Sequence, residues 1–109
     1  MESISREKLY AQVGVRIRKA REAQIPKVTQ SGLAERLKVE RTSVTNIEKG
    51  TQRATLQILY GIARELKVSL TALLPEIDDP SILTGVAEVT VGKRTQTVPT
   101  AVKSVFEKV

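Results

Sequence analysis

The chain has 109 residues, of which 40% are hydrophobic and 28% charged, and it carries a formal net charge of +6. It contains no cysteine and no histidine, which excludes disulfides and thiol chemistry and removes the most common general base and metal ligand. The carboxylates show no paired, motif-like spacing, so we expect a protein that is not an enzyme and holds no metal or cofactor.

The hydropathy pattern contains no apolar run near the ~20 residues that a membrane-spanning helix needs. The first ten residues, MESISREKLY, lack the apolar core of a signal peptide. Together with the absence of cysteine, these features predict a cytoplasmic protein without a membrane partner.

The charge is distributed unevenly along the chain. Residues 1–75 contain 14 basic and 7 acidic side chains, whereas residues 76–109 contain 4 basic and 5 acidic ones. A basic first part favours a polyanionic partner such as nucleic acid, although charge alone is equally compatible with an ordinary solvated basic surface.

The first predicted element is a helix over residues 5–23, with Ser5 as its N-cap. Its apolar residues recur at spacings of four and three, which places them on one face. They are Leu9, Val13, Ile17 and Ala20. Pro26 ends this helix, because the residue before a proline is disfavoured in the helical conformation.

Four shorter helices are predicted after the first. Their ranges are 30–37, 41–49, 56–66 and 70–74, with Thr29 and Thr55 as N-caps of the first and third and Pro75 directly after the last. Five short helices joined by short loops predict an all-α bundle, and we assign residues 1–75 to this one domain.

Residues 76–109 have a different pattern and are predicted to form a linker and a C-terminal arm. The linker, EIDDPS, is acidic and contains a proline, and VAEVTV with RTQTV could form a hairpin. A short final helix would carry Val102, Val105, Phe106 and Val109 on one face. A hairpin and one helix are marginal alone, so this arm either packs against a partner, such as a second copy, or is flexible.

The helix predicted over residues 41–49, RTSVTNIEK, is rich in residues with low helix propensity. Val44 and Ile47 would face inward. The outward side chains can all donate hydrogen bonds: Arg41, Thr42, Thr45, Asn46 and Lys49. Arginine can bond guanine and asparagine can bond adenine in the major groove of DNA, so this face is suited to reading bases. Taken alone, the pattern also fits an ordinary solvated polar face.

The wider pattern resembles the helix-turn-helix unit of the lambda-repressor and Cro-like family, often called the XRE family. The resemblance covers residues 13–74 and is strongest in QSGLAERLKVERTSVTNIEK, residues 30–49. The matches are Thr29–Gln30 at the entry, Ala34 where the two helices touch, Ile47–Glu48 with Gly50 at the end, and apolar Leu33, Leu37, Val39, Val44 and Ile47. Lys38 departs from the pattern, because this turn usually holds a glycine that tolerates a left-handed backbone.

This resemblance implies a role for each matched residue. Arg41, Thr42, Thr45 and Asn46 would read bases, and Gln30, Lys49, Thr51, Gln52 and Arg53 would contact DNA phosphates. Arg21 and Glu48 would form an ion pair that ties the reading helix to the first helix. Dimerisation would involve Leu70, Leu73 and Leu74, and we add Val102, Val105 and Phe106 of the arm.

The resemblance implies a sequence-specific DNA-binding transcriptional regulator, which we expect to be a repressor that binds a palindromic operator of double-stranded DNA as a homodimer. An alternative of a different class is a protein-interaction regulator. It would be an antitoxin that sequesters a toxin, or a repressor cleaved by a partner metallopeptidase in a phage-defence locus. For cleavage, the extended segment PSILTG, residues 80–85, is the expected site.

Overall fold

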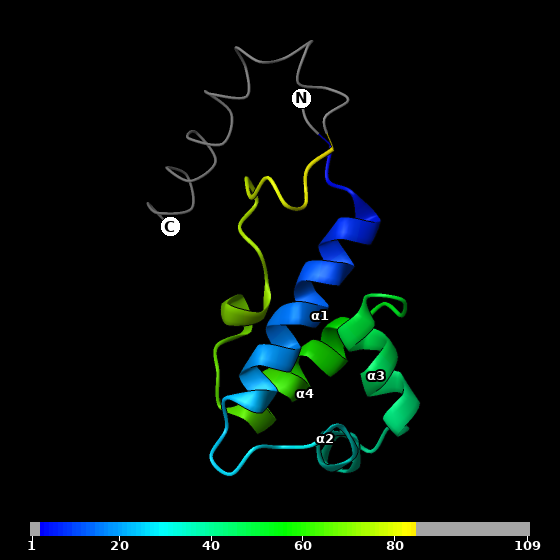
Figure 1. The fold of residues 1–109 in the computed structure, drawn as a ribbon, viewed down its shortest axis with the longest axis vertical. Coiled ribbons are helices and arrows are strands. Elements are labelled where there is room, and N and C mark those ends of the chain that lie inside the picture. The colour runs from blue at the N-terminus through cyan, green and yellow to red at the C-terminus, as the bar shows by residue number, and fades with distance from the viewer. Residues whose placement is uncertain (1–2, 85–109) are drawn as a thin grey trace.

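A computed structural model describes residues 3–84 of the chain, which fold into helices around one core (Figure 1). The elements are α1 (Arg6–Glu22), α2 (Gln30–Leu37), α3 (Arg41–Lys49), α4 (Leu56–Leu66) and the 3₁₀ helix η1 (Leu70–Leu73). The predicted all-α class is confirmed for these residues, and each of the four α-helices lies within one residue of its expected bounds. The prediction of residues 85–109 as a hairpin and helix falls outside the described residues.

The predicted N-caps are present at three of the helices. The side-chain oxygens of Ser5, Thr29 and Thr55 accept hydrogen bonds from backbone N–H groups in the first turns of α1, α2 and α4. Each cap satisfies one of the donors that the first turn of a helix leaves unpaired.

The fifth helix is not the short α-helix that the sequence predicted. Residues Leu70–Leu73 form a single 3₁₀ turn, and Leu74 is already extended, with φ −113° and ψ 134°. Pro75 explains the difference, because a proline disfavours helical backbone in the residue before it. The segment is therefore too short to close a regular α-helical turn.

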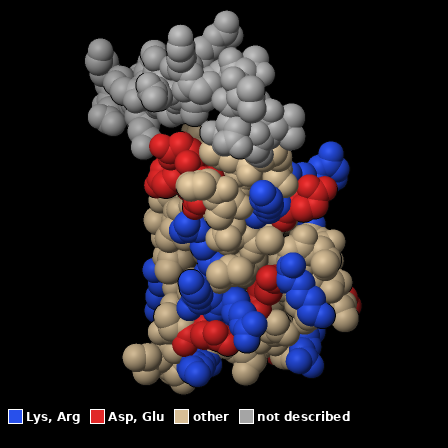
Figure 2. Space-filling view, turned by 45° about the horizontal axis from the view of Figure 1, so that its top comes forward, with Lys and Arg blue, Asp and Glu red and all other residues tan. Residues whose placement is uncertain are grey.

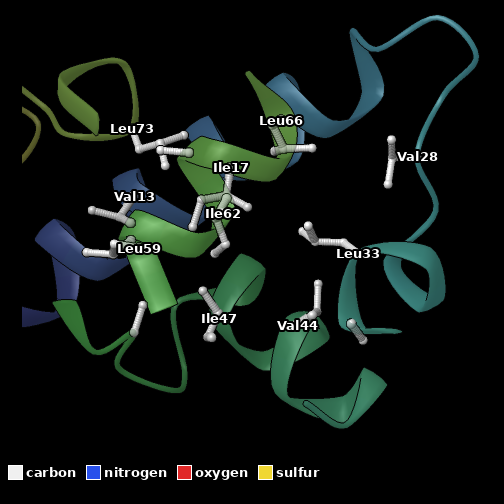
Figure 3. Close-up of a cluster of buried hydrophobic side chains, with 13 residues drawn as sticks. Val13, Ile17, Val28, Leu33, Val44, Ile47, Leu59, Ile62, Leu66 and Leu73 are labelled. Carbon is white, nitrogen blue, oxygen red and sulfur yellow. The ribbon is translucent and has the colours of Figure 1, made fainter. Parts of the chain in front are cut away.

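The helices share one apolar core, to which all five elements and the loop before α2 contribute (Figure 3). Ile17 of α1, Leu33 of α2 and Leu66 of α4 are fully buried at its centre. Val44 and Ile47 of α3 are also buried, at 2% and 3% exposure, so packing holds α3 in shape despite its low propensity.

The turn between α2 and α3 has the strained backbone that the sequence suggested. Lys38 has φ 59° and ψ 42°, the left-handed conformation in which glycine is usual. Lys67 caps α4 in the same conformation, with φ 57°, which was not predicted from the sequence. Both residues end their helices by donating a backbone N–H to carbonyls of the last turn.

The chain after η1 returns along α1 to the N-terminal end of the fold (Figure 1). Ile82 is buried at 1% exposure, and its carbonyl accepts from the Ser5 backbone N–H at 2.7 Å. Ile4 and Leu83 form an antiparallel bridge. The expectation of an extended apolar segment at residues 80–85 is therefore wrong for its described part, because residues 80–82 form turns and Ile82 is buried, while Gly85 lies outside the described residues.

Among residues 3–84, no helix combines the length and the apolar character required to cross a bilayer.

Candidate nucleic-acid interface

The outer side of α3 has the composition and exposure predicted for a base-reading surface. Arg41, Thr42 and Lys49 are exposed, and Thr45 and Asn46 are half-buried. Within residues 3–84, the Arg41 guanidinium and the Asn46 amide make no hydrogen bond or ion pair with the protein. These two groups are therefore available to an external partner.

A buried ion pair fixes α3 against α1. The Arg21 guanidinium donates from Nε to Glu48 Oε2 at 2.7 Å and from Nη2 to Glu48 Oε1 at 2.9 Å. Its Nη1 also donates to the Val28 carbonyl at 2.9 Å, which ties the loop before α2 to the same group. The hydrogen bonds that Arg21 donates to Glu48 raise the pKa of the Arg21 guanidinium above its usual value. The predicted pairing of these two residues is present.

A chain of hydrogen bonds continues from this ion pair to the outer side of α3. Gln30 Nε2 donates to Glu48 Oε1 at 2.9 Å, and the Thr45 hydroxyl donates to Gln30 Oε1 at 2.8 Å. The orientation of the Gln30 amide follows from chemistry, because an ionised carboxylate can only accept hydrogen bonds. The first residue of α2 therefore connects the buried pair to a predicted base-reading residue.

Hydrogen bonds inside the protein limit what Gln30 can offer to a phosphate. The resemblance assigned the Gln30 side chain and the nearby backbone N–H groups to a DNA phosphate, but the amide oxygen and one amide N–H are engaged inside the protein. The backbone N–H groups of Gln30 and Ser31 have no intrahelical acceptor, since they begin α2. These groups and the second amide N–H are what remains for a phosphate.

Gly14 allows α1 and α3 to approach closely, a role that was not predicted from the sequence. A Cβ atom at Gly14 would lie 2.5 Å from the Ile47 carbonyl oxygen and closer still to that of Glu48. Any side chain at this position would push α3 away from α1. A glycine in the middle of a predicted helix, one residue from the buried Val13, was the available signal.

The loop after α3 presents the remaining predicted phosphate contacts. Lys49, Thr51 and Arg53 are exposed, and Gln52 is half-buried. The Asn46 carbonyl anchors the loop by accepting from the backbone N–H groups of Thr51 and Gln52 and from the Thr51 hydroxyl. The Thr51 hydroxyl proton is thus used internally, while the cations of Lys49 and Arg53 remain outward.

The surface of the described residues is basic overall. Residues 3–84 contain 14 basic and 9 acidic side chains. Figure 2 shows Lys and Arg spread over much of one face, with acids in smaller groups between them. A groove of about 890 Å³ lies between α2 and α4. Its lining combines basic Arg36, Lys38 and Arg64 with Leu37, Val39, Ile58 and Tyr60.

The predicted dimerisation residues fall into two groups. Leu73 belongs to the core and has no exposed surface. Its side chain therefore cannot be part of a dimer surface. Leu70 and Leu74 are half-buried and keep some exposed area. Val102, Val105 and Phe106 lie outside the described residues, as does most of the arm on which the antitoxin and peptidase alternatives depend.

Comparisons with known proteins agree with this geometry. A helix-turn-helix family model, HTH_3, matches residues 17–73. The structure is similar to the restriction-modification controller protein C.AhdI from Aeromonas hydrophila, with TM-score 0.55 and 25% identity over 60% of this chain and 96% of that one. It is also similar to the controller protein C.Esp1396I, with TM-score 0.52 and 30% identity over 67% and 85% of the two chains.

A third similar structure is an enzyme, hydroxypropylphosphonic acid epoxidase from S. wedmorenis. The TM-score is 0.60 with 25% identity, and the match covers 68% of this chain but only 38% of the epoxidase. The likeness therefore concerns a minor part of that enzyme. No curated protein matches the sequence.

Proposed function

The chain belongs to the lambda-repressor and Cro-like (XRE) family of helix-turn-helix proteins, and we propose that it is a repressor that binds a palindromic operator as a homodimer. The family and the similarity to two controller proteins make it a DNA-binding transcriptional regulator. The repressor role, the operator symmetry and the homodimer are our proposals.

The observation that carries the proposal is the outer side of α3. It combines the Arg41 guanidinium and the Asn46 amide, which have no hydrogen-bond partner within residues 3–84, with a helix fixed from behind by the Arg21–Glu48 pair. Arginine recognises guanine through its O6 and N7 atoms, and asparagine recognises adenine through N6 and N7. Such contacts need a helix that is held rigidly, because hydrogen bonds to base edges tolerate little displacement.

Contacts to the DNA backbone would position this helix. We assign phosphate contacts to the first backbone N–H groups of α2 and to the cations of Lys49 and Arg53 at the other end of the unit. Thr51 and Gln52 lie between these two residues in the sequence and would contact the phosphates of the same DNA strand. Such contacts provide affinity and register, whereas α3 provides the sequence preference.

A single α3 offers one short set of base contacts, which supports binding as a symmetric pair. Two reading helices in a two-fold dimer of this class lie about 34 Å apart, one turn of DNA. Leu70 and Leu74, which flank the buried Leu73, are our candidates for the dimer surface within the described residues. Repression would follow from occupation of promoter DNA without any chemical step.

The test is selection of bound fragments from random double-stranded DNA at two salt concentrations, followed by sedimentation with the recovered site. We expect an enriched palindrome with half-sites about one helical turn apart. The complex should contain two chains per site. Recovery of fragments without a shared sequence, with affinity lost steeply as salt rises, would instead indicate general attraction to a polyanion. Co-purification of a toxin or a peptidase would favour the protein-interaction alternative.

A further inference from the structure

The hydrogen-bond chain that ends at Thr45 restricts what this residue can present to DNA. Arg21 donates to Glu48, Gln30 donates to Glu48, and Thr45 donates to Gln30. Each donor in the chain is oriented by the next acceptor, and the carboxylate at its inner end can only accept. The direction of every hydrogen bond is therefore determined by Glu48.

The Thr45 hydroxyl carries one proton, and two internal acceptors lie within reach of it. Gln30 Oε1 is 2.8 Å away and the Arg41 carbonyl oxygen, one turn earlier in α3, is 3.2 Å away. The proton is therefore directed into the protein in either case. The hydroxyl cannot donate to a base without breaking a hydrogen bond in a half-buried site, which carries a desolvation penalty.

The engagement of the hydroxyl leaves the methyl group as the part of the Thr45 side chain that no hydrogen bond uses. Cβ carries the hydroxyl and the methyl in different directions, and the hydroxyl is directed toward α2 and the preceding turn of α3. The residue is half-buried and lies on the side of α3 that also exposes Arg41 and Thr42. In the major groove, the C5-methyl group of thymine is the apolar feature that such a group recognises.

We propose that Thr45 reads a thymine through its methyl group, and that Gln30 is the positioning residue that enforces this choice by holding the hydroxyl inward. This inference rests on the proposed function and adds to it the chemical class of one base contact. It reassigns Gln30 from phosphate binding alone to the control of base preference. It also separates Thr45 from Arg41 and Asn46, which would read bases by hydrogen bonding.

The experiment uses the full chain and the operator recovered by selection, with thymines replaced one at a time by deoxyuridine, which lacks only the methyl group. For the wild-type protein we expect one thymine per half-site whose replacement weakens binding about fourfold. Thr45→Val keeps the methyl and should retain this thymine-to-deoxyuridine difference. Thr45→Ser keeps the hydroxyl and should abolish it.

Gln30→Met tests the positioning role, because methionine fills similar space without an amide. We expect this variant to reduce the thymine preference at the same position, because only the longer 3.2 Å hydrogen bond to the Arg41 carbonyl then holds the hydroxyl inward. Its thermal unfolding should show a folded protein, and an unchanged thymine preference in this variant would overturn the positioning role of Gln30. Retention of the preference in Thr45→Ser and its loss in Thr45→Val would overturn the proposal and assign the contact to the hydroxyl. An unaltered preference in every position-45 variant would overturn it too. Failure of the wild type to select any sequence would instead refute the proposed function.

Discussion

Arg21 and Glu48 are 27 residues apart in the chain and form a two-point ion pair between α1 and α3. The side chains of the two residues are 9% and 3% exposed, so the pair is almost free of solvent. It is the inner end of the hydrogen-bond chain that reaches Thr45, and it also holds the loop before α2 through the Val28 carbonyl. The relative positions of α1, α3 and the loop before α2 thus depend on the Arg21 guanidinium.

Breaking this pair from one side should be costly. Glu48→Ala leaves the Arg21 charge buried without its partner, and we expect a loss of about 3–5 kcal/mol in the free energy of unfolding, measured by urea denaturation. Arg21→Met with Glu48→Met should cost much less than the sum of the two single changes. The exposed pair Arg18–Glu22 is the control, and Glu22→Ala should cost less than about 0.5 kcal/mol. Equal losses in Glu48→Ala and Glu22→Ala would show that the buried pair has no special role.

The Arg41 and Asn46 side chains of α3 should affect binding and not folding. Arg41→Ala and Asn46→Ala should each weaken binding to the selected operator by about 1–3 kcal/mol and relax the preference at one base position. Helical content by circular dichroism should not change, because neither side chain bonds within residues 3–84. If the double variant keeps the operator preference, α3 is not the reading helix.

Arg53 should contribute to affinity without contributing to sequence preference. Arg53→Ala should weaken binding to operator and random DNA by similar factors and reduce the slope of log affinity against log salt by about one. Arg64→Ala, which removes the same charge from α4 outside the predicted contact set, is the control and should leave the slope unchanged. A loss confined to the operator would contradict a backbone role for Arg53.

Gly14 and Gly61 permit a matched test of the contact between α1 and α3. Both lie inside helices, so alanine brings the same gain in helix propensity at each. At Gly14 the new Cβ meets backbone carbonyls of α3, whereas at Gly61 it meets only a Leu37 methyl at 3.0 Å, which can move. We expect Gly14→Ala to lower the free energy of unfolding by about 1–3 kcal/mol and Gly61→Ala to change it by less than about 1 kcal/mol. Similar values for both variants in thermal and urea unfolding would show that α3 can shift freely.

Ile82 should be required for the stability of the helical domain. Ile82→Ala removes a side chain that is 1% exposed, and we expect a loss of about 2–5 kcal/mol by urea denaturation. Ile77→Ala, at a residue that is 58% exposed, is the control and should fall within about 0.5 kcal/mol of the wild type. A fragment ending at residue 75 should therefore unfold more readily than one ending at residue 84. Equal stability of the two fragments would show that the returning segment is dispensable.

The four α-helices could be predicted because local signals are strong there, whereas the Arg21–Glu48 pair, 27 residues apart, was implied by the resemblance to the family. Threonine and serine caps, apolar spacing and the family motif all lie within short stretches of sequence. The features that were missed depend on contacts between distant segments. Gly14 matters because of a carbonyl that is 33 or 34 residues later, and the direction of the Thr45 hydroxyl depends on an amide in another helix.

The returning segment was misjudged for a related reason. EIDDPSIL has the composition of a linker, and its acidic residues and proline give no sign that Ile82 is buried. Burial follows from the return of this segment to the N-terminal end of the fold, where its backbone pairs with residues 3–5. The sequence of the segment itself does not show which part of the fold it packs against. Lys38, in contrast, could be anticipated as left-handed, because the family pattern names the turn in which it lies.

The hydrogen bond from the Thr84 backbone N–H to the Ser3 carbonyl, at 2.8 Å, has a practical consequence for handling the protein. It brings the entry and the exit of the described chain together at one end of the fold, while α2 lies at the other end (Figure 1). Attachment to a sensor surface through a tag before Ser3 should therefore leave α2 and α3 pointing into solution. The same closeness makes residues 3–84 suited to circular permutation, with a short linker joining the two ends and new termini opened in the loop before α2.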